Sequence, residues 1–116
     1  MVPGIYAVRF VSGSPSSNFG IGVVVVDGDT INGGDQSHLY KGQFTLQGDT
    51  MRASIEVSHY QGEGWSSIFG NIKHFKLTLE GKVSNEHNGF TLTGRIEGQP
   101  QHTIEIVGER KSGLIK

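Results

Sequence analysis

The sequence predicts an all-β fold, a small up-and-down antiparallel β-barrel of about eight strands. Three observations predict it. Apolar and polar residues alternate along nearly every segment with a period of two, which sends successive side chains to opposite faces of a sheet. The connections are short and rich in glycine, asparagine and aspartate, as in hairpins. The runs number about eight, enough for a meander to close and remove its open edges.

The expected strands follow one another along a single domain, residues 1–116. They span residues 4–12, 19–27, 29–33, 37–47, 50–60, 72–82, 88–98 and 101–109. The turn signals between them accept positive φ or fix a turn: Asp27-Gly28, Gly48-Asp49, Asn88-Gly89 and Gly98-Gln99-Pro100. Because the connections are short, neighbouring strands should be antiparallel. We therefore expect a calycin-like or lipocalin-like barrel.

The later strands each have one apolar and one polar face. In residues 50–60, Met51 and Val57 share one face while Arg52 and Glu56 share the other. Apolar side chains of inward parity would line the interior: Tyr6, Phe10, Tyr40, Phe44, Met51, Phe75, Leu77 and Phe90. A small barrel either fills itself with such side chains or keeps room for one small ligand. A packed core is favoured, and an apolar ligand cavity is the alternative.

The second strand, FGIGVVVVDG, breaks the alternation because it is apolar on both faces. One of its faces belongs to the barrel interior, so the other needs a separate cover. A short chain can supply a local helix or lid, or a second copy of itself, and a two-fold dimer is the commonest such solution. We expect a homodimer whose interface uses Ile21, Val23, Val24, Val25 and Val26.

The stretch INGGDQSHLY, residues 31–40, could be a phosphate-binding loop or a bend between two strands. A phosphate-binding glycine loop needs a helix directly behind it, whereas the residues that follow continue as a strand. The bend is therefore favoured. Gly33 and Gly34 would supply positive φ, and Asp35 would accept backbone N–H groups in an Asx-type turn. Losing one such hydrogen bond in Asp35→Ala would cost about 1 kcal/mol.

The connection YQGEGWSSIFGN, residues 60–71, is longer than a hairpin needs and contains the single tryptophan, Trp65. It could form a lid or a short helical plug, with Trp65 and Phe69 near a barrel mouth.

Composition narrows the functional classes. Ten Lys and Arg residues against 11 Asp and Glu residues create no strong field for nucleic acid or an anionic membrane. The absence of cysteine excludes disulfides and thiolate chemistry. The N-terminus lacks the pattern of a signal peptide, and no apolar run approaches the ~20 residues that span a bilayer. A soluble, cytoplasmic protein is expected.

The candidate catalytic groups are scattered. The five histidines form no HExxH motif, and His59 and His102 are expected at opposite barrel mouths. The serines near residues 14–17 lie in no GxSxG elbow. The outward glutamates lie beside Lys or Arg, as in solvated cross-strand ion pairs: Glu56, Glu80, Glu97 and Glu105. The sequence therefore predicts neither an enzyme nor a metal or cofactor site.

Three segments taken in order, GIYAVRFVS, FGIGVVVVDGDTINGGD and LYKGQF, resemble the GrlR family, small bacterial regulators of type III secretion. The resemblance is clearest from Gly4 to about Phe44, and beyond residue 60 only the strand rhythm supports it. Its motif residues are Gly4, Ile5, Tyr6, Gly33, Gly34, Asp35, Tyr40 and Gly42.

The resemblance implies a cytoplasmic, dimeric, non-enzymatic protein with a calycin-like barrel that represses secretion genes by binding a transcriptional activator. In the family an exposed acidic stretch between strands 4 and 5 engages that activator. The corresponding partner-binding residues here are Gln47, Gly48 and Asp49, with one acid where the family has a run. With a single acid, this turn lacks most of the negative charge that would attract a basic activator. The family's activator is therefore not assigned as the partner of this chain.

The leading hypothesis is thus a regulatory binding protein that acts by protein–protein interaction. The alternative is a carrier or sensor of a small apolar ligand held in the barrel lumen. An enzyme of the barrel-isomerase kind would need titratable groups that converge inside the barrel, where the residues of inward parity are almost wholly apolar.

Overall fold

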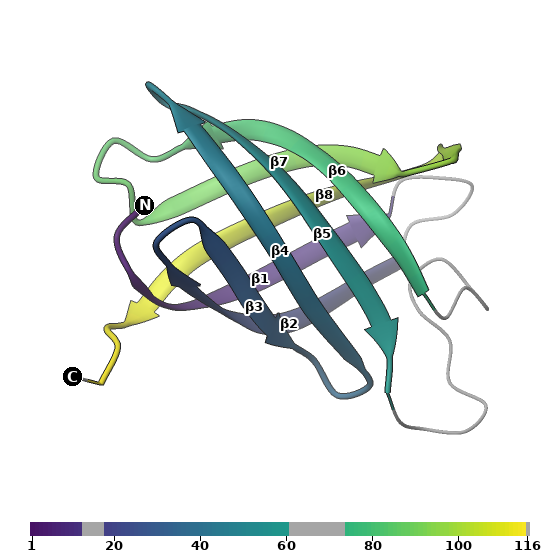
Figure 1. Cartoon of the computed structure of the whole chain (residues 1–116), viewed down its shortest axis with the longest axis horizontal. Helices are drawn as coiled ribbons and strands as arrows, with labels where there is room; N and C mark the ends of the chain where they lie inside the picture. The colour runs from purple at the N-terminus through teal and green to yellow at the C-terminus, as the bar shows by residue number, and fades with distance from the viewer. Residues whose placement is uncertain (13–17, 61–73, 116) are drawn as a thin grey trace.

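A computed structural model describes residues 1–12, 18–60 and 74–115 and shows a closed barrel of eight antiparallel strands in chain order (Figure 1). The strands are β1 (Gly4–Ser12), β2 (Asn18–Asp27), β3 (Thr30–Gly34), β4 (His38–Gln47), β5 (Thr50–His59), β6 (His74–Val83), β7 (Gly89–Ile96) and β8 (Gln99–Ser112). Each strand pairs with the next one, and β8 pairs with β1. The predicted fold class is confirmed. Within the described ranges, no helix could cross a membrane.

The last strand differs most from its predicted range, because β8 begins at Gln99 and continues to Ser112. This strand closes the barrel and therefore pairs along both β7 and β1. Its pairing with β1 reaches Ile5 opposite Ser112, with a register shift between Ile5 and Tyr6. The two partners are offset along β8, because β7 pairs with it from Gln99 to Glu109 and β1 from Ile104 to Ser112. Backbone hydrogen bonds to both partners therefore extend the strand beyond its apolar run.

The barrel interior holds one cluster of apolar side chains drawn from all eight strands. The alternation predicted for the later strands is confirmed, since Met51 and Leu92 have no exposed surface and Leu77 has 2%. Two rings from opposite ends of the chain, Tyr6 and Phe90, stack with centroids 5.9 Å apart. Burial of these side chains is the main stabilising term of the fold.

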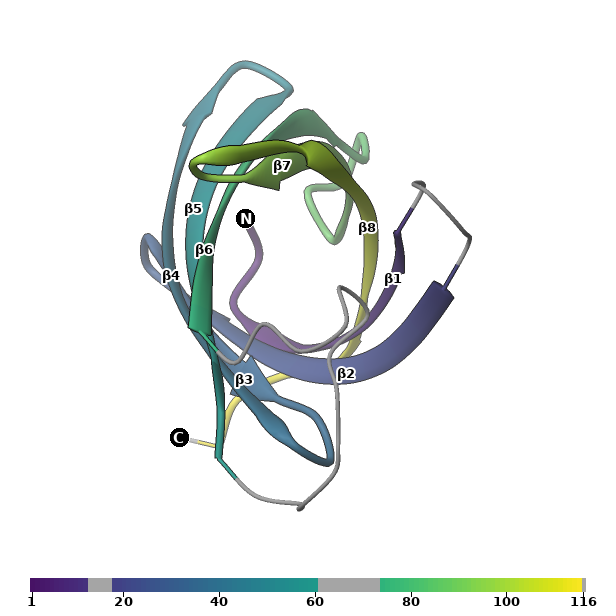
Figure 2. The ribbon, with the colours of Figure 1, turned by 90° about the vertical axis from the view of Figure 1, so that its right-hand side faces the viewer.

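One end of the barrel is closed by the N-terminal residues, and we call it the closed end. The Val2 N–H donates to the His87 carbonyl at 2.9 Å, and the Tyr6 hydroxyl donates to the Val2 carbonyl at 2.6 Å. Met1 packs against the core. The other end, where β1, β3, β5 and β7 finish, is called the mouth. Figure 2 looks toward the mouth and shows the strands as a ring.

The glycines of the predicted bend act differently from the expectation. Positive φ occurs at turn glycines Gly28, Gly48 and Gly98, whereas Gly33 and Gly34 lie in β3 with ordinary extended backbone. The prediction that they supply positive φ is therefore wrong. A Cβ on Gly33 would lie 2.0 Å from the Val23 carbonyl oxygen, so the missing side chain allows β2 and β3 to approach closely.

The valine-rich strand β2 also requires a correction. Ile21, Val23 and Val25 are 66%, 49% and 36% exposed on the outer wall, whereas Val24 and Val26 are 4% and 0% exposed in the core. The prediction that all five residues share an interface is wrong for Val24 and Val26, because strand alternation points them into the barrel. The predicted lid at residues 60–71 lies outside the described residues apart from Tyr60.

Candidate functional site

A surface of exposed apolar side chains runs over the outer wall of β1, β2 and β4. Strand register brings most of it together, since Val25 lies opposite Ile5 and Val23 lies opposite Gly34, which in turn lies opposite Leu39. The charged Arg9 lies on the same wall, opposite Ile21. Gly34 carries no side chain that could separate Val23 from Leu39. We call this surface the apolar face, and it consists of Ile5, Val11, Ile21, Val23, Val25 and Leu39.

The outer wall of the later strands is polar, which sets the apolar face apart. Arg52 Nε lies 2.6 Å from Glu80 Oε1, as expected for a solvated cross-strand pair. Glu105 departs from that expectation, because its register partners are Thr93 and Val11 and not a basic residue. Charged and hydroxyl side chains dominate this wall, so the apolar face is local and not a general property of the surface.

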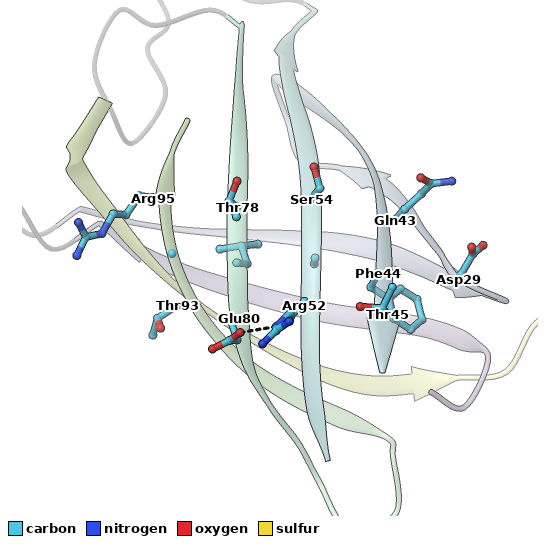
Figure 3. Close-up of a pocket in the computed structure, with 13 residues that line it drawn as sticks. Asp29, Gln43, Phe44, Thr45, Arg52, Ser54, Thr78, Glu80, Thr93 and Arg95 are labelled. Atoms are coloured by element: carbon cyan, nitrogen blue, oxygen red, sulfur yellow. Dashed lines mark hydrogen bonds and ion pairs between the residues drawn. The ribbon is translucent and has the colours of Figure 1, made fainter. Parts of the chain in front are cut away.

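An open hollow of about 600 Å³ lies on this polar wall across β4 to β7 (Figure 3). Small side chains such as Ser54 and Thr78 line it, and the Arg52–Glu80 ion pair crosses it. Arg95 points away from that ion pair in Figure 3. The acid and the base of the pair neutralise each other in solvent, so the hollow brings together no activated acid, base or nucleophile.

The residues predicted to line a ligand cavity do share the barrel interior. Seven of the eight are buried, and Phe10 packs partly buried against them. Aromatic rings occupy the room beside the inward-facing glycines. A Cβ on Gly20 would lie 2.4 Å from the Phe10 ring, and one on Gly108 would lie 2.3 Å from the Phe90 ring. These contacts describe a packed core around the glycines.

At the mouth, Asp35 organises the bend before β4. Its Oδ1 accepts the backbone N–H groups of Ser37 at 2.9 Å and His38 at 2.8 Å, which is the Asx-type turn that the sequence predicts. Its Oδ2 accepts the Tyr40 hydroxyl. Burial alone would raise the pKa of Asp35, but the hydrogen bonds from Tyr40, Ser37 and His38 outweigh it and lower the pKa. The carboxylate is held ionised.

The histidines are arranged differently from the prediction. His59 ends β5 and His102 lies near the start of β8, so both are at the mouth and the expectation of opposite mouths is wrong. His38, at the start of β4, lies directly opposite His59. The sequence does not reveal this pair, because two residues 21 positions apart meet only in one register of β4 against β5. Across the described ranges, no three potential metal ligands cluster.

Ser37 and His38 do not form a nucleophilic pair. The Ser37 hydroxyl lies 2.8 Å from His38 Nδ1, and Asp35 Oδ1 lies 3.5 Å from the same nitrogen. A catalytic triad needs the serine and the carboxylate on different ring nitrogens. Ser37 is also only 1% exposed, so a substrate could not reach it. This arrangement orients the imidazole and activates no nucleophile.

The predicted partner-binding turn, Gln47, Gly48 and Asp49, is exposed at the closed end between β4 and β5. Its single acid already has an intramolecular partner, because Asp49 Oδ1 lies 3.3 Å from Lys82 Nζ. The Asp49 carbonyl also accepts the Val83 N–H at 2.9 Å. The turn is therefore held against the end of β6 and presents little negative charge.

Comparison with known proteins adds two likenesses. No protein-family model matches the chain. It is 32% identical over 79 residues to the phosphoribosylaminoimidazole-succinocarboxamide synthase of Hahella chejuensis, which covers 67% of this chain but only 32% of that protein. Its structure is similar to isotype 1 transferrin binding protein B of serogroup B Neisseria meningitidis, with a TM-score of 0.56, 11% identity, and coverage of 96% of this chain and 26% of that one. The second likeness concerns the fold alone.

Proposed function

We propose that this chain is a non-enzymatic regulatory binding protein of the bacterial cytoplasm. It would act by protein–protein interaction as a negative regulator similar to the GrlR regulators of type III secretion, and it would form a homodimer. The observation that carries this proposal is the apolar face, on which Ile21 is 66% exposed and Val23 is 49% exposed. Contiguous apolar surface of this kind marks interaction sites on proteins in water.

Barrel closure restricts how two copies can associate. Each strand has a partner on both sides in the closed barrel, although the short β3 pairs with β2 only over Val23–Asp27. Pairing through strand edges is therefore limited. Association would use the outer wall, whose apolar part lies on β1, β2 and β4. A two-fold arrangement would place Val23 and Val25 of one copy against the same residues of the other, because such an interface is self-complementary.

The carrier alternative places an apolar ligand in the lumen. The rings of Phe10 and Phe90 occupy the space beside Gly20 and Gly108 that such a ligand would need. This packing favours binding at the outer wall over binding in the lumen. The corresponding partner is a protein, which the resemblance suggests to be a transcriptional activator. Asp49 is already paired with Lys82, so recognition through an acidic turn is not part of the proposal.

The test is light scattering coupled to size exclusion at several protein concentrations, on the natural chain and two variants. Val23→Lys introduces a charge into the apolar face at an exposed position and should convert a dimer to a monomer without unfolding the barrel. Thr93→Lys is the matched control, because Thr93 is exposed and lies opposite Glu80 and Glu105. A monomer for the natural chain at every concentration, or a dimer that survives Val23→Lys, would contradict the proposal.

A further inference from the structure

Two imidazoles meet at the mouth of the barrel in a geometry suited to one metal ion. His38 and His59 are directly opposite residues of β4 and β5, and their ring centroids lie 5.3 Å apart with the planes inclined at 61°. Zinc–nitrogen bonds of about 2.0–2.1 Å and a tetrahedral angle place two imidazole centres on one zinc ion about 5.3 Å apart. The observed centroid spacing therefore matches that of two imidazoles on one ion.

The surroundings of His38 match those of metal-binding histidines. Such a histidine almost always uses its second ring nitrogen in a hydrogen bond to a carboxylate, carbonyl or water, which sets the tautomer and the ring orientation. Here Nδ1 of His38 faces the Ser37 hydroxyl at 2.8 Å and Asp35 Oδ1 at 3.5 Å. With the proton on Nδ1, the lone pair resides on Nε2, the nitrogen that would coordinate the ion.

The same bend is fixed against the end of β5, which carries His59. The Tyr60 N–H donates to the Ser37 carbonyl at 2.9 Å, and the Tyr60 hydroxyl donates to the Asp35 carbonyl at 3.1 Å. These bonds hold the two histidines in place before any ion arrives. A preorganised pair of ligands loses less conformational entropy on binding.

The Nε2 atom of His59 makes no hydrogen bond within the described part of the chain. This nitrogen is also buried. A buried polar nitrogen without a partner is costly, and a metal ion is one of the groups that relieve that cost.

From this geometry we propose that His38 and His59 bind one divalent transition-metal ion of the zinc, copper or nickel class at the mouth of the barrel. Imidazole nitrogens suit these ions and not magnesium or calcium, which prefer oxygen. The two histidines supply two of the coordination positions, and water or a bound partner takes the others. Asp35 and Ser37 act as positioning residues for the His38 ring.

The test uses chain freed of metal by chelation and titrated with Zn²⁺ by calorimetry. The expected result is one ion bound per chain. His59→Asn should reduce the affinity by more than about 100-fold, because even loss of an outer-shell partner costs about 10- to 100-fold, and Ser37→Ala should reduce it by about tenfold. The matched control is His87→Asn at the closed end, where φ is +58° and asparagine tolerates that backbone.

Two further measurements keep the proposal open to refutation. Circular dichroism of metal-free His59→Asn should match that of the natural chain, which separates loss of a ligand from loss of the fold. Imidazole nitrogen spectra of the natural chain should shift on Zn²⁺ addition only at His38 and His59. No binding by the natural chain, equal binding by His59→Asn, or equal loss in His87→Asn would overturn the proposal. None of these results depends on the dimer.

Discussion

At the scale of single residues, the Asp35 carboxylate is the main hydrogen-bond acceptor in the bend between β3 and β4. It accepts two backbone N–H groups and the Tyr40 hydroxyl, and its neighbour His38 is only 3% exposed. The sequence predicts one of these roles, the turn hydrogen bond. It could not predict the Tyr40 contact, because that contact depends on how β4 leaves the bend.

Asp35→Ala should therefore cost more than the single turn bond expected from the sequence. It leaves the buried Tyr40 hydroxyl and the N–H groups of Ser37 and His38 without their acceptor, so we expect a loss of about 3 kcal/mol in the free energy of unfolding. Chemical denaturation of the variant measures it. Asp35→Asn is the control that keeps an acceptor oxygen, and a loss as large as that of Asp35→Ala would argue against the hydrogen-bond explanation.

At the scale of secondary-structure elements, the strands approach one another where glycine removes a side chain. Gly33 faces the Val23 carbonyl across β2 and β3, and Gly81 would place a Cβ 1.9 Å from the Thr91 carbonyl across β6 and β7. The turn glycine Gly48 serves a different purpose, because it has φ of +64° and open space around it. The sequence shows glycines at all three positions but not which purpose each one has.

Because Gly33 allows close strand packing and Gly48 allows positive φ, replacing each with alanine should destabilise the fold by a different amount. Gly33→Ala forces β2 and β3 apart and should lower the free energy of unfolding by about 1–3 kcal/mol. Gly48→Ala strains only the turn backbone and should cost about 1 kcal/mol. Thermal unfolding of both variants beside the natural chain gives the comparison. If Gly33→Ala proves as stable as the natural chain, the strands do not approach as closely as described.

At the scale of the whole molecule, one buried tyrosine lies near each end of the barrel, Tyr6 at the closed end and Tyr40 at the mouth. Tyr6 donates to the N-terminal segment at the closed end, and Tyr40 donates to Asp35 at the mouth. Burial raises the pKa of Tyr6 despite the opposing charge of Arg110. Burial also raises the pKa of Tyr40, and the hydrogen bond to Asp35 and its negative charge add to the effect. Both hydroxyls remain protonated in the folded chain where the unfolded chain would ionise.

This arrangement predicts a loss of stability in alkali. The unfolded tyrosines titrate near pH 10, so their contribution is fully present below about pH 10 and is lost as the pH rises toward the higher folded values. Urea unfolding at about pH 8 and about pH 11 should show the fall, and Tyr6→Phe should show a smaller one. An equal fall in Tyr6→Phe would mean that Tyr6 does not contribute.

Much of the architecture could be predicted because strand alternation is a local property. The alternation of apolar and polar residues within one strand predicts that Met51 and Leu77 face inward, and the structure confirms this prediction. The candidate sites depend on register instead. Hydropathy alone predicts Val24 at an interface, but only the closed barrel decides which side chains of β2 face inward. His38 and His59 meet for the same reason.

By itself, the sequence determined that the chain forms a closed barrel of about eight antiparallel strands, because period-two patterning and short turns leave a meander little alternative. It also determined the Asx-type turn at Asp35. The tertiary structure decided which valines are exposed and which histidines face each other. Those features belong to pairs of residues distant in sequence, and only the pairing and closure of the strands bring such residues together.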